Sequence, residues 1–208
     1  MAVSAILLGL FAVIGTGMVS LTYENTAERI AANHRETLLK TLHELIPADQ
    51  YDNDIFSDTI RISNPALLGS DNAVNVYRAR KAGQPVAAII ESIAPDGYSG
   101  NIYLLIAIKY NGQIAGVRVV NHRETPGLGD AIDTSHSNWI LSFTGKSLKN
   151  LKAKDWAVKR DGGKFDQFTG ATITPRAVVK AVHNALIYFD QHRDELFAPA
   201  TVKKESTS

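Results

Sequence analysis

The first 23 residues contain no charged side chain, and this constrains the fold more than any other feature of the sequence. Residues 2–21 form an uncharged, mostly apolar stretch. As an α-helix rising ~1.5 Å per residue, that stretch would cross a hydrocarbon core of about 30 Å. The 22 Lys and Arg and the 21 Asp and Glu residues all lie from Glu24 onward. The sequence therefore predicts a single-pass transmembrane anchor over residues 1–23 and a water-soluble part after it.

Two other interpretations of this stretch are a cleaved signal peptide and a buried core helix. A secretory signal normally has basic residues before the apolar run and an Ala-x-Ala-like cleavage site after it, and neither is evident here. A retained span is therefore favoured. Arg29, Arg35 and Lys40 follow the span and no Lys or Arg precedes it, so the positive-inside rule weakly favours a cytoplasmic domain.

Composition excludes several classes of function. A net charge of +1 without a block of Lys or Arg gives no electrostatic surface for nucleic acid. Because there is no cysteine, disulfide scaffolds, iron–sulfur clusters, thiol catalysis and cysteine-based zinc sites are excluded. The six histidines show no zinc-ligand spacing, so no metal site is expected.

The soluble part divides into three segments. Apolar residues spaced by three and four predict an amphipathic helix that Pro47 ends, and we assign residues 24–47 to this connecting helix. Residues 48–197 are long enough for one well-cored domain. Residues 198–208 have the polar composition of a disordered tail.

Four strands are predicted in the first half of the domain, as two hairpins. Gly83-Gln84 and Asn111-Gly112 supply the turns, and Asn-Gly favours a turn in which both residues have positive φ. The third strand is apolar on both faces, so helices are expected to cover the sheet. The expected fold is α+β with an antiparallel sheet. The strands span residues 75–82, 85–93, 102–110 and 113–121.

Three elements are predicted after the sheet. Residues 138–143 suggest a short helix and residues 155–158 a further strand. The last is a long amphipathic helix over residues 175–196. Its expected start is Thr174 as the N-cap, followed by Pro175 at the first helical position.

The residues that lead into this last helix have the chemistry of an anion site. Residues 166–175 combine small residues that expose the backbone with hydroxyls at Thr169, Thr172 and Thr174. A helix N-terminus offers unpaired N–H donors and a favourable dipole, so a phosphate near Thr172 would be well placed. Alternatively, the segment is only a glycine turn followed by a helix cap.

A second unusual loop directly follows the fourth strand. In residues 122–130, Pro126 stiffens the chain, while Gly127 and Gly129 let the backbone approach a flat or crowded group. The alternative is an ordinary Pro-Gly turn.

Together these features resemble a known family. Asp-x-x-Thr-Gly-Ala-Thr at 166–172, Glu-Thr-Pro-Gly-Leu-Gly at 124–129 and an N-terminal span are similar to the covalently flavinylated FMN-binding domain family. The similarity is greatest to the G subunits of Rnf-type (Rsx) ion-translocating electron transport complexes, and it covers nearly the whole chain. The resemblance implies an electron-transfer flavoprotein subunit of a membrane-bound complex of the ferredoxin/NAD type. Such a subunit belongs to a translocase and has no catalytic activity of its own.

The resemblance also implies roles for individual residues. Thr172 matches the threonine that carries FMN through a phosphoester bond, which a separate flavin transferase installs, and Asp166 matches the acidic residue of that transferase's recognition motif. Tyr98, Tyr103, His122 and Arg123 are further candidate neighbours of the flavin. The expected cofactor-binding residues are Thr172, Thr169, Gly170, Ala171, Thr174, Asp166, Glu124, Thr125, Pro126, Gly127, Leu128 and Gly129.

The side of the membrane on which the domain lies and the function of the protein each have alternatives. In the family the flavin domain lies on the periplasmic side of the inner membrane, against the weak charge signal, and we follow the family. Basic residues usually precede the span in the family and are absent here. Three functional alternatives remain: the C subunit of a sodium-pumping NADH:quinone reductase, which is normally longer, a stand-alone flavin reductase, and a flavin-free membrane-anchored binding protein.

Overall fold

The computed structural model describes residues 2–198 of the chain, which divide into two compact units between Leu42 and His43. The predicted disordered tail lies, except for Ala198, outside the described residues.

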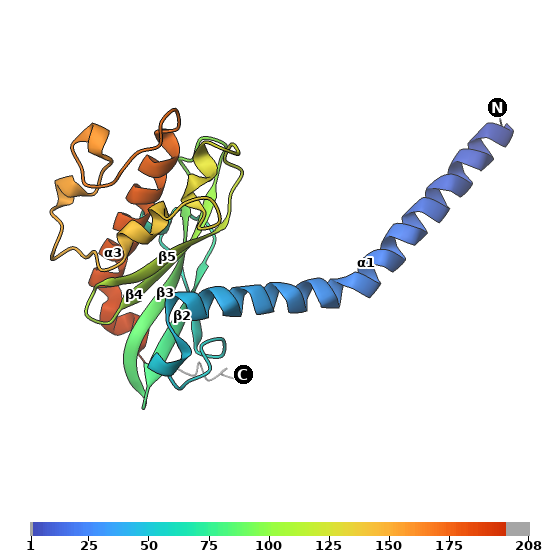
Figure 1. Ribbon diagram of the computed structural model, residues 1–208. Coiled ribbons are helices and arrows are strands. Elements are labelled where there is room, and N and C mark those ends of the chain that lie inside the picture. The colour runs from blue at the N-terminus through green and yellow to red at the C-terminus, as the bar shows by residue number, and fades with distance from the viewer. Residues whose placement is uncertain (1, 199–208) are drawn as a thin grey trace, which may run out of the picture. The chain divides into compact units, whose positions relative to one another are not determined.

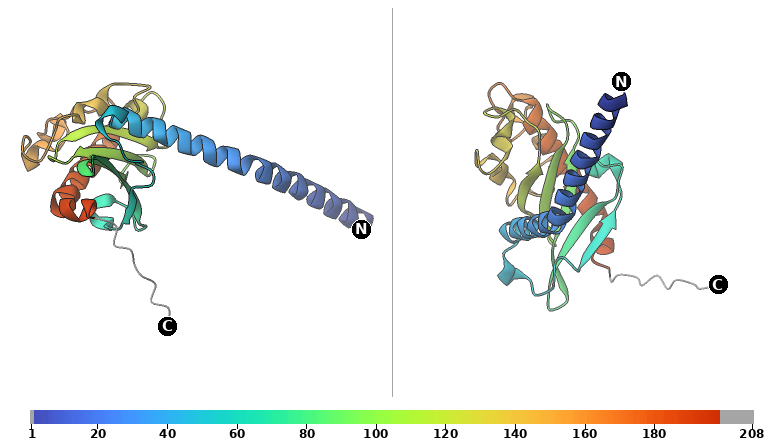
Figure 2. Two further views of the ribbon diagram at one scale, coloured as in Figure 1. Left: turned by 90° about the horizontal axis from the view of Figure 1, so that it is seen from below. Right: turned by 90° about the vertical axis from the view of Figure 1, so that its right-hand side faces the viewer.

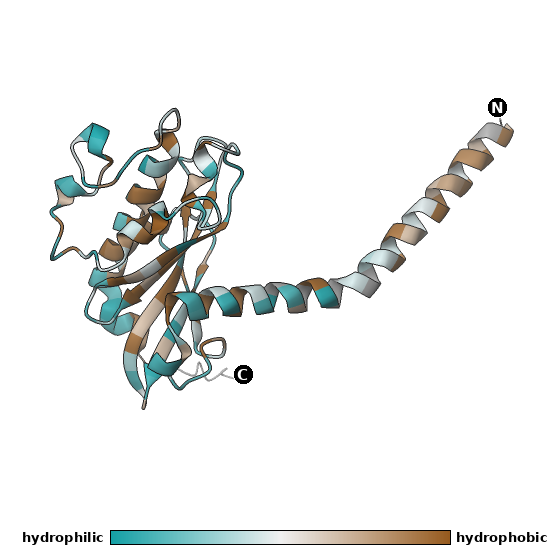
Figure 3. Ribbon diagram, viewed as in Figure 1, coloured by the Kyte–Doolittle hydropathy of each residue, from teal (hydrophilic) through white to brown (hydrophobic). Residues whose placement is uncertain are grey.

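The first unit belongs to one long helix, α1 (Ala2–Leu45), which stops just before Pro47 as predicted. Within it, Ala5–Tyr23 is long and apolar enough to cross a membrane, with a mean hydropathy of 2.1. None of this window is buried by protein. Figure 3 shows the contrast, with pale and apolar turns in the first half of α1 and hydrophilic turns in the second. The helix therefore has the properties of a membrane anchor.

The second unit is built on one antiparallel sheet in the order β1-β2-β3-β4-β5 (Figure 1). The two predicted hairpins are confirmed, and no strand end is shifted by more than one residue. The edge strand β1 was not predicted, because it has only four residues and lies within a polar, irregular segment. The strands are β1 (Thr59–Ile62), β2 (Val74–Lys81), β3 (Gln84–Ala94), β4 (Ile102–Lys109) and β5 (Ile114–Asn121).

The two hairpin turns differ from the predicted geometry. The two-residue turn with positive φ lies at Ala82-Gly83, where φ is 50° and 75°. In the second hairpin the carbonyl of Lys109 accepts from Gly112 N–H at 2.8 Å. Of the residues in that turn, all described by the structure, only Gly112 has a positive φ, at 87°. Asn111-Gly112 therefore closes a longer turn with glycine in the left-handed position, and the predicted geometry was wrong.

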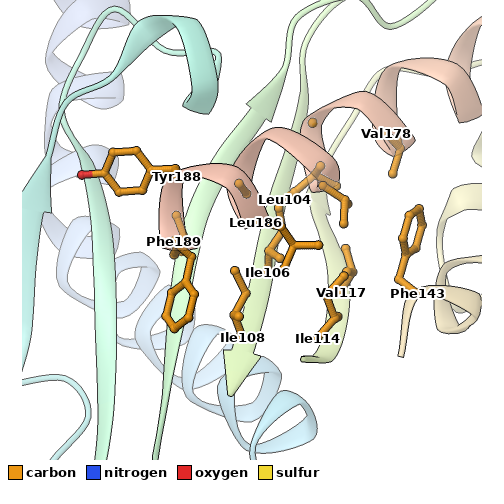
Figure 4. Packing of buried hydrophobic residues seen from close by; sticks show 14 of the residues in the cluster. Leu104, Ile106, Ile108, Ile114, Val117, Phe143, Val178, Leu186, Tyr188 and Phe189 are labelled. Carbon is orange, nitrogen blue, oxygen red and sulfur yellow. The ribbon is translucent and has the colours of Figure 1, made fainter. Parts of the chain in front are cut away.

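One face of the sheet packs against α3 (Ile173–Phe197), as Figures 1 and 2 show. Alternate residues of β4 point toward α3, because side chains along a strand alternate between its faces. Figure 4 shows this interior, in which Ile106 and Leu104 lie beside Leu186 of α3. Burial of a side chain of this size stabilises the fold by roughly 1.5–3 kcal/mol.

The opposite face is covered mainly by the last residues of α1 and by the chain that follows them. Leu45, Ile46 and Ile55 are buried, as are the sheet residues Ile89 and Leu105. A side chain on Gly116 would approach Leu45 to 2.9 Å, so this cover lies directly on β5. The prediction that both faces are covered is confirmed, although only α3 covers its face as a complete helix.

Short helices fill the connections, and one predicted strand is absent. Residues 155–158 contribute only the end of one short helix and a single bridge between Val158 and Phe165. Trp156 and Phe165 instead contact each other as buried aromatic anchors of this loop, with their rings tilted by 32°. The predicted helix near residue 140 is confirmed as a 3₁₀-helix. The short helices are η1 (Ala48–Gln50), α2 (Pro65–Leu68), η2 (Gly129–Ile132), η3 (Trp139–Phe143), η4 (Ala153–Asp155) and η5 (Lys159–Asp161).

The start of α3 differs from the prediction. The helix begins at Ile173, so Thr172 occupies the N-cap position and Thr174 lies in the first turn. Its other end is fixed by the sheet, since Arg78 donates to the carbonyls of Leu196 and Ala198 at 3.2 and 2.9 Å. Asp58 pairs with the Arg78 guanidinium and balances its buried charge. Helix α3 is thereby held at a defined position along the sheet.

Candidate functional site

A pocket of about 280 Å³ opens at the end of the sheet where α3 begins. Three segments meet there: the β3–β4 connection, the loop after β5 and the approach to α3. Residues 122–130 and residues 166–175 therefore contribute to one pocket, although 35 residues separate them in the sequence. Its lining residues are Tyr98, Glu124, Thr125, Leu128, Gly129, Gly170, Ala171, Thr172, Ile173 and Thr174.

The sheet topology explains why these segments meet. Strand β3 ends and β4 begins at the same edge, because the two strands are antiparallel and Ala94 pairs with Ile102. Strand β5 ends there too, since Asn121 pairs with Tyr103. Helix α3 starts above this edge (Figure 1). The segments that line the pocket are thus held in place by the ends of β3, β4 and β5 and by the start of α3.

Glu124 connects all three segments. Its side chain is 4% exposed, and Ser99 N–H in the β3–β4 connection donates to Oε1 at 2.9 Å. The hydroxyl of Thr174, which is fully buried in α3, donates to Oε2. A side chain on Gly129 would approach both Glu124 and Thr174 to 2.9 Å, so glycine is needed for this close packing. The carboxylate therefore fixes the walls of the pocket relative to each other.

Thr172 is half-buried at the edge of the pocket and has an unusual cap geometry. It occupies the N-cap of α3, but its hydroxyl makes no cap hydrogen bond. The N–H groups of Ile173 and Thr174 lie in the first helical turn, where α-helical hydrogen bonding gives them no partner. A free hydroxyl therefore lies next to free donors at the positive end of a helix.

The remainder of the pocket wall is apolar. Tyr98, Leu128 and Ile173 are 68%, 44% and 46% exposed. Large side chains exposed together around a concave surface are typical of a binding site for an apolar or aromatic group. Ile173 was not predicted as a pocket residue. The sequence signal that could have identified it was its position directly after the motif that ends at Thr172. Tyr98, a candidate neighbour of the flavin, lines the pocket.

Four of the predicted binding residues do not line this pocket. Asp166 is exposed and pairs with Lys159 at 2.5 Å, while its backbone carbonyl accepts from Trp139 Nε1 at 2.7 Å. Thr169 is exposed in the turn before Gly170. Pro126 and Gly127 lie on the outer side of their loop, where Gly127 N–H donates to Asp130 Oδ2 at 2.9 Å. These residues shape the loops around the pocket.

Sequence comparison defines the class of protein. Residues 97–187, which include every residue that lines the pocket, match the model of the FMN-binding domain. Residues 1–45, which correspond to α1, match the model of the RnfG N-terminal region. The chain is therefore an FMN-binding protein of the membrane, and residues 2–198 contain one helix able to span it.

Relatives of known type identify the family. Proteins named as the G subunit of an ion-translocating oxidoreductase complex are 51% identical in Pseudomonas aeruginosa, 48% in Pseudoalteromonas atlantica and 46% in Aliivibrio fischeri. Each alignment covers 93–94% of this chain and 91–92% of the relative. The chain belongs to this family of G subunits, and it is one subunit of a translocase that contains others. The membership decides against the alternative C subunit.

The pocket suits FMN chemically. Its volume is near the lower end of the roughly 300–1,000 Å³ found for small-molecule sites, so part of a bound FMN would stay accessible from outside. Free helix donors beside Thr172 suit a phosphate, and the apolar wall suits a flat ring. Within residues 2–198, no group of three or more His, Cys, Asp or Glu side chains is arranged to hold a metal ion.

Proposed function

We propose that this G subunit carries FMN covalently on Thr172 and relays electrons between other subunits of its complex. FMN supplies the redox chemistry, since it can accept and release electrons, while the protein holds and orients it. No diffusible substrate is bound. The complex belongs to the ferredoxin/NAD type that couples electron transfer to ion movement.

The observation that carries the proposal is the free hydroxyl of Thr172. An N-cap threonine usually accepts a hydrogen bond from the first turn, and its loss costs about 1 kcal/mol. Thr172 leaves that interaction unmade at the edge of the pocket. A phosphoester at Oγ1 would bring its phosphate charge to the N–H groups of Ile173 and Thr174, where the helix end favours an anion.

A covalent bond also suits the open form of the pocket. A shallow site gives limited binding energy, and a free ligand loses translational and rotational entropy when it binds. A tether removes most of that cost. Tyr98, Leu128 and Ile173 would then orient the flavin ring and leave an edge accessible to a redox partner.

A separate flavin transferase is proposed to install the FMN. Asp166, the acidic residue of the matched motif, is exposed beyond the pocket and held by Lys159. Thr169 and Gly170 beside it are exposed as well. An enzyme could therefore bind this turn before the pocket receives the flavin.

Mass spectrometry of the full chain, purified from cells that contain the transferase, tests the attachment. The expected mass includes one FMN, and Thr172→Ala should lack it. Thr144→Ala is the matched control and should keep its FMN, because it removes an exposed threonine hydroxyl that lies outside the motif and does not line the pocket. An unmodified wild-type chain, or an FMN retained by Thr172→Ala, would exclude Thr172 as the attachment point.

The flavin domain is proposed to face the periplasm from the inner membrane. The proposal rests on the resemblance of the whole chain to its family. The opposing charge signal depends on only Arg29, Arg35 and Lys40, and partner subunits can fix the orientation of a single span.

A further inference from the structure

We propose that Glu124 is a positioning residue that sets the geometry and the redox potential of the flavin site through its buried negative charge. This inference rests on the proposed function only in that FMN occupies the pocket at Thr172. The inference adds a role for the Glu124 carboxylate, which the proposed function treats only as one of the residues that line the pocket.

Glu124 holds two walls of the pocket together. Glu124 Oε1 holds the β3–β4 connection through Ser99 N–H, one residue from Tyr98. Oε2 holds the first turn of α3 through Thr174, two residues from Thr172. One carboxylate therefore sets the distance between the attachment point and the aromatic side chain across the pocket.

Glu124 also acts on the pocket electrostatically. The side chain is 4% exposed. Among the residues that the structure describes, no Lys, Arg or His forms an ion pair with it. Its two donors are a backbone N–H and a hydroxyl, both neutral. A charge in a poorly solvated site acts strongly on its neighbours, so the carboxylate places a negative potential on the pocket.

The consequence for a bound flavin follows from the sign of that potential. Reduction adds electrons to the ring, and a nearby negative charge raises their energy. Glu124 therefore lowers the midpoint potential and makes the reduced cofactor a better electron donor. The positive end of α3 acts in the opposite sense and lies nearer to the phosphate attached at Thr172.

Glu124→Gln removes the charge of the side chain and keeps its shape, so it tests the effect of the charge alone. Glutamine has nearly the same size, its Oε1 can accept from Ser99 N–H, and its amide can donate to the Thr174 hydroxyl. We expect full FMN incorporation and a higher midpoint potential in a dithionite titration of the purified full chain followed by flavin absorbance. At a fixed potential the reduced-to-oxidised ratio should rise about tenfold, equivalent to about 30 mV for a two-electron couple.

Glu91→Gln is the matched control. Glu91 is a carboxylate of the same domain with Asn75 and Tyr77 as hydrogen-bond partners, and it does not line the pocket. Its substitution should leave the potential unchanged. Glu124→Ala removes both hydrogen bonds and should change the flavin absorbance and fluorescence as well, whereas Glu124→Gln should restore the wild-type spectrum.

The outcomes distinguish this inference from the proposed function. A loaded Glu124→Gln protein with an unshifted potential, or an equal shift in Glu91→Gln, would overturn the role of the charge. A Glu124→Ala protein with the wild-type spectrum would overturn the positioning role. Absence of FMN from the wild-type chain would instead contradict the proposed attachment at Thr172.

Discussion

Thr174 and Glu124, which lie 50 positions apart in the sequence, share a buried hydrogen bond that joins α3 to the loop after β5. The hydroxyl of Thr174 is fully buried and donates to Oε2 of Glu124. This contact explains why Thr174 does not cap the helix. Its side chain is hydrogen-bonded to Glu124, and Thr172 occupies the N-cap position.

Thr174→Val should destabilise the domain by about 1–3 kcal/mol. Valine has a similar shape but leaves the buried Glu124 carboxylate without one of its two donors, and a buried acceptor that loses its partner is costly. Urea unfolding of the detergent-solubilised full chain measures the change. Thr174→Ser keeps the hydroxyl and should retain most of the stability. Equal stability of the valine and serine variants would contradict the importance of this hydrogen bond.

The local parts of the fold could be predicted because each has a short-range signal. Strand-like runs joined by turn residues located both hairpins, and Pro47 located the end of α1. The errors came from long-range packing. The segment at residues 155–158 resembles a strand, yet its aromatic residue Trp156 packs against Phe165 as an anchor. Its one described strand-type contact is a single bridge between Val158 and Phe165.

The turn at Asn111-Gly112 shows a limit of dipeptide rules. Asn-Gly favours positive φ at both positions, but the hydrogen bonds of this hairpin place the turn one residue earlier, over Tyr110 and Asn111. The turn with positive φ at both positions occurs in the first hairpin, where Ala82 and Gly83 adopt it without an Asn-Gly pair. Strand register decides the turn type, and the register depends on the whole sheet.

The pocket was only partly predictable. The two motifs could be identified from sequence, but the contact between Glu124 and Ser99 depends on how β3, β4 and β5 end at one edge. Ile173 carried no signal of its own. Its role follows from the start of α3, which tertiary contacts moved two residues before the position predicted from Pro175.

Phe143→Ala should cost about 3–5 kcal/mol, the usual range for removal of a buried aromatic ring. Phe143 is fully buried and stacks on Phe165 with ring centroids 4.5 Å apart. Figure 4 shows its ring beside Val178 of α3. Leu141→Ala in the same short helix is the control, because Leu141 is exposed. Urea denaturation should show a change of less than about 0.5 kcal/mol for the control. Similar losses in both variants would contradict the packing.

His183 should make the domain less stable in mild acid. Burial lowers the pKa of its imidazole below the usual 6.5, and its ring stacks on Trp156 at 5.1 Å. The unfolded chain therefore binds a proton more readily than the folded one, so protonation below about pH 6.5 favours unfolding. Above that pH both states are neutral and the effect vanishes. His183→Gln should lose less stability between pH 7.5 and pH 5 than the wild type, as measured by urea unfolding at both pH values. An identical pH dependence would contradict this assignment.

The absence of cysteine allows a direct test of membrane sidedness. A single cysteine introduced as Ala153→Cys would lie on an exposed short helix of the flavin domain, whereas Ala2→Cys would lie before the span. With a periplasmic domain, a maleimide that cannot cross the inner membrane should label the residue at 153 in intact spheroplasts. The residue at 2 should react only after the membrane is permeabilised. The cysteine-free wild type reports background labelling, and the reverse pattern would place the domain in the cytoplasm, as the charges of Arg29, Arg35 and Lys40 favour.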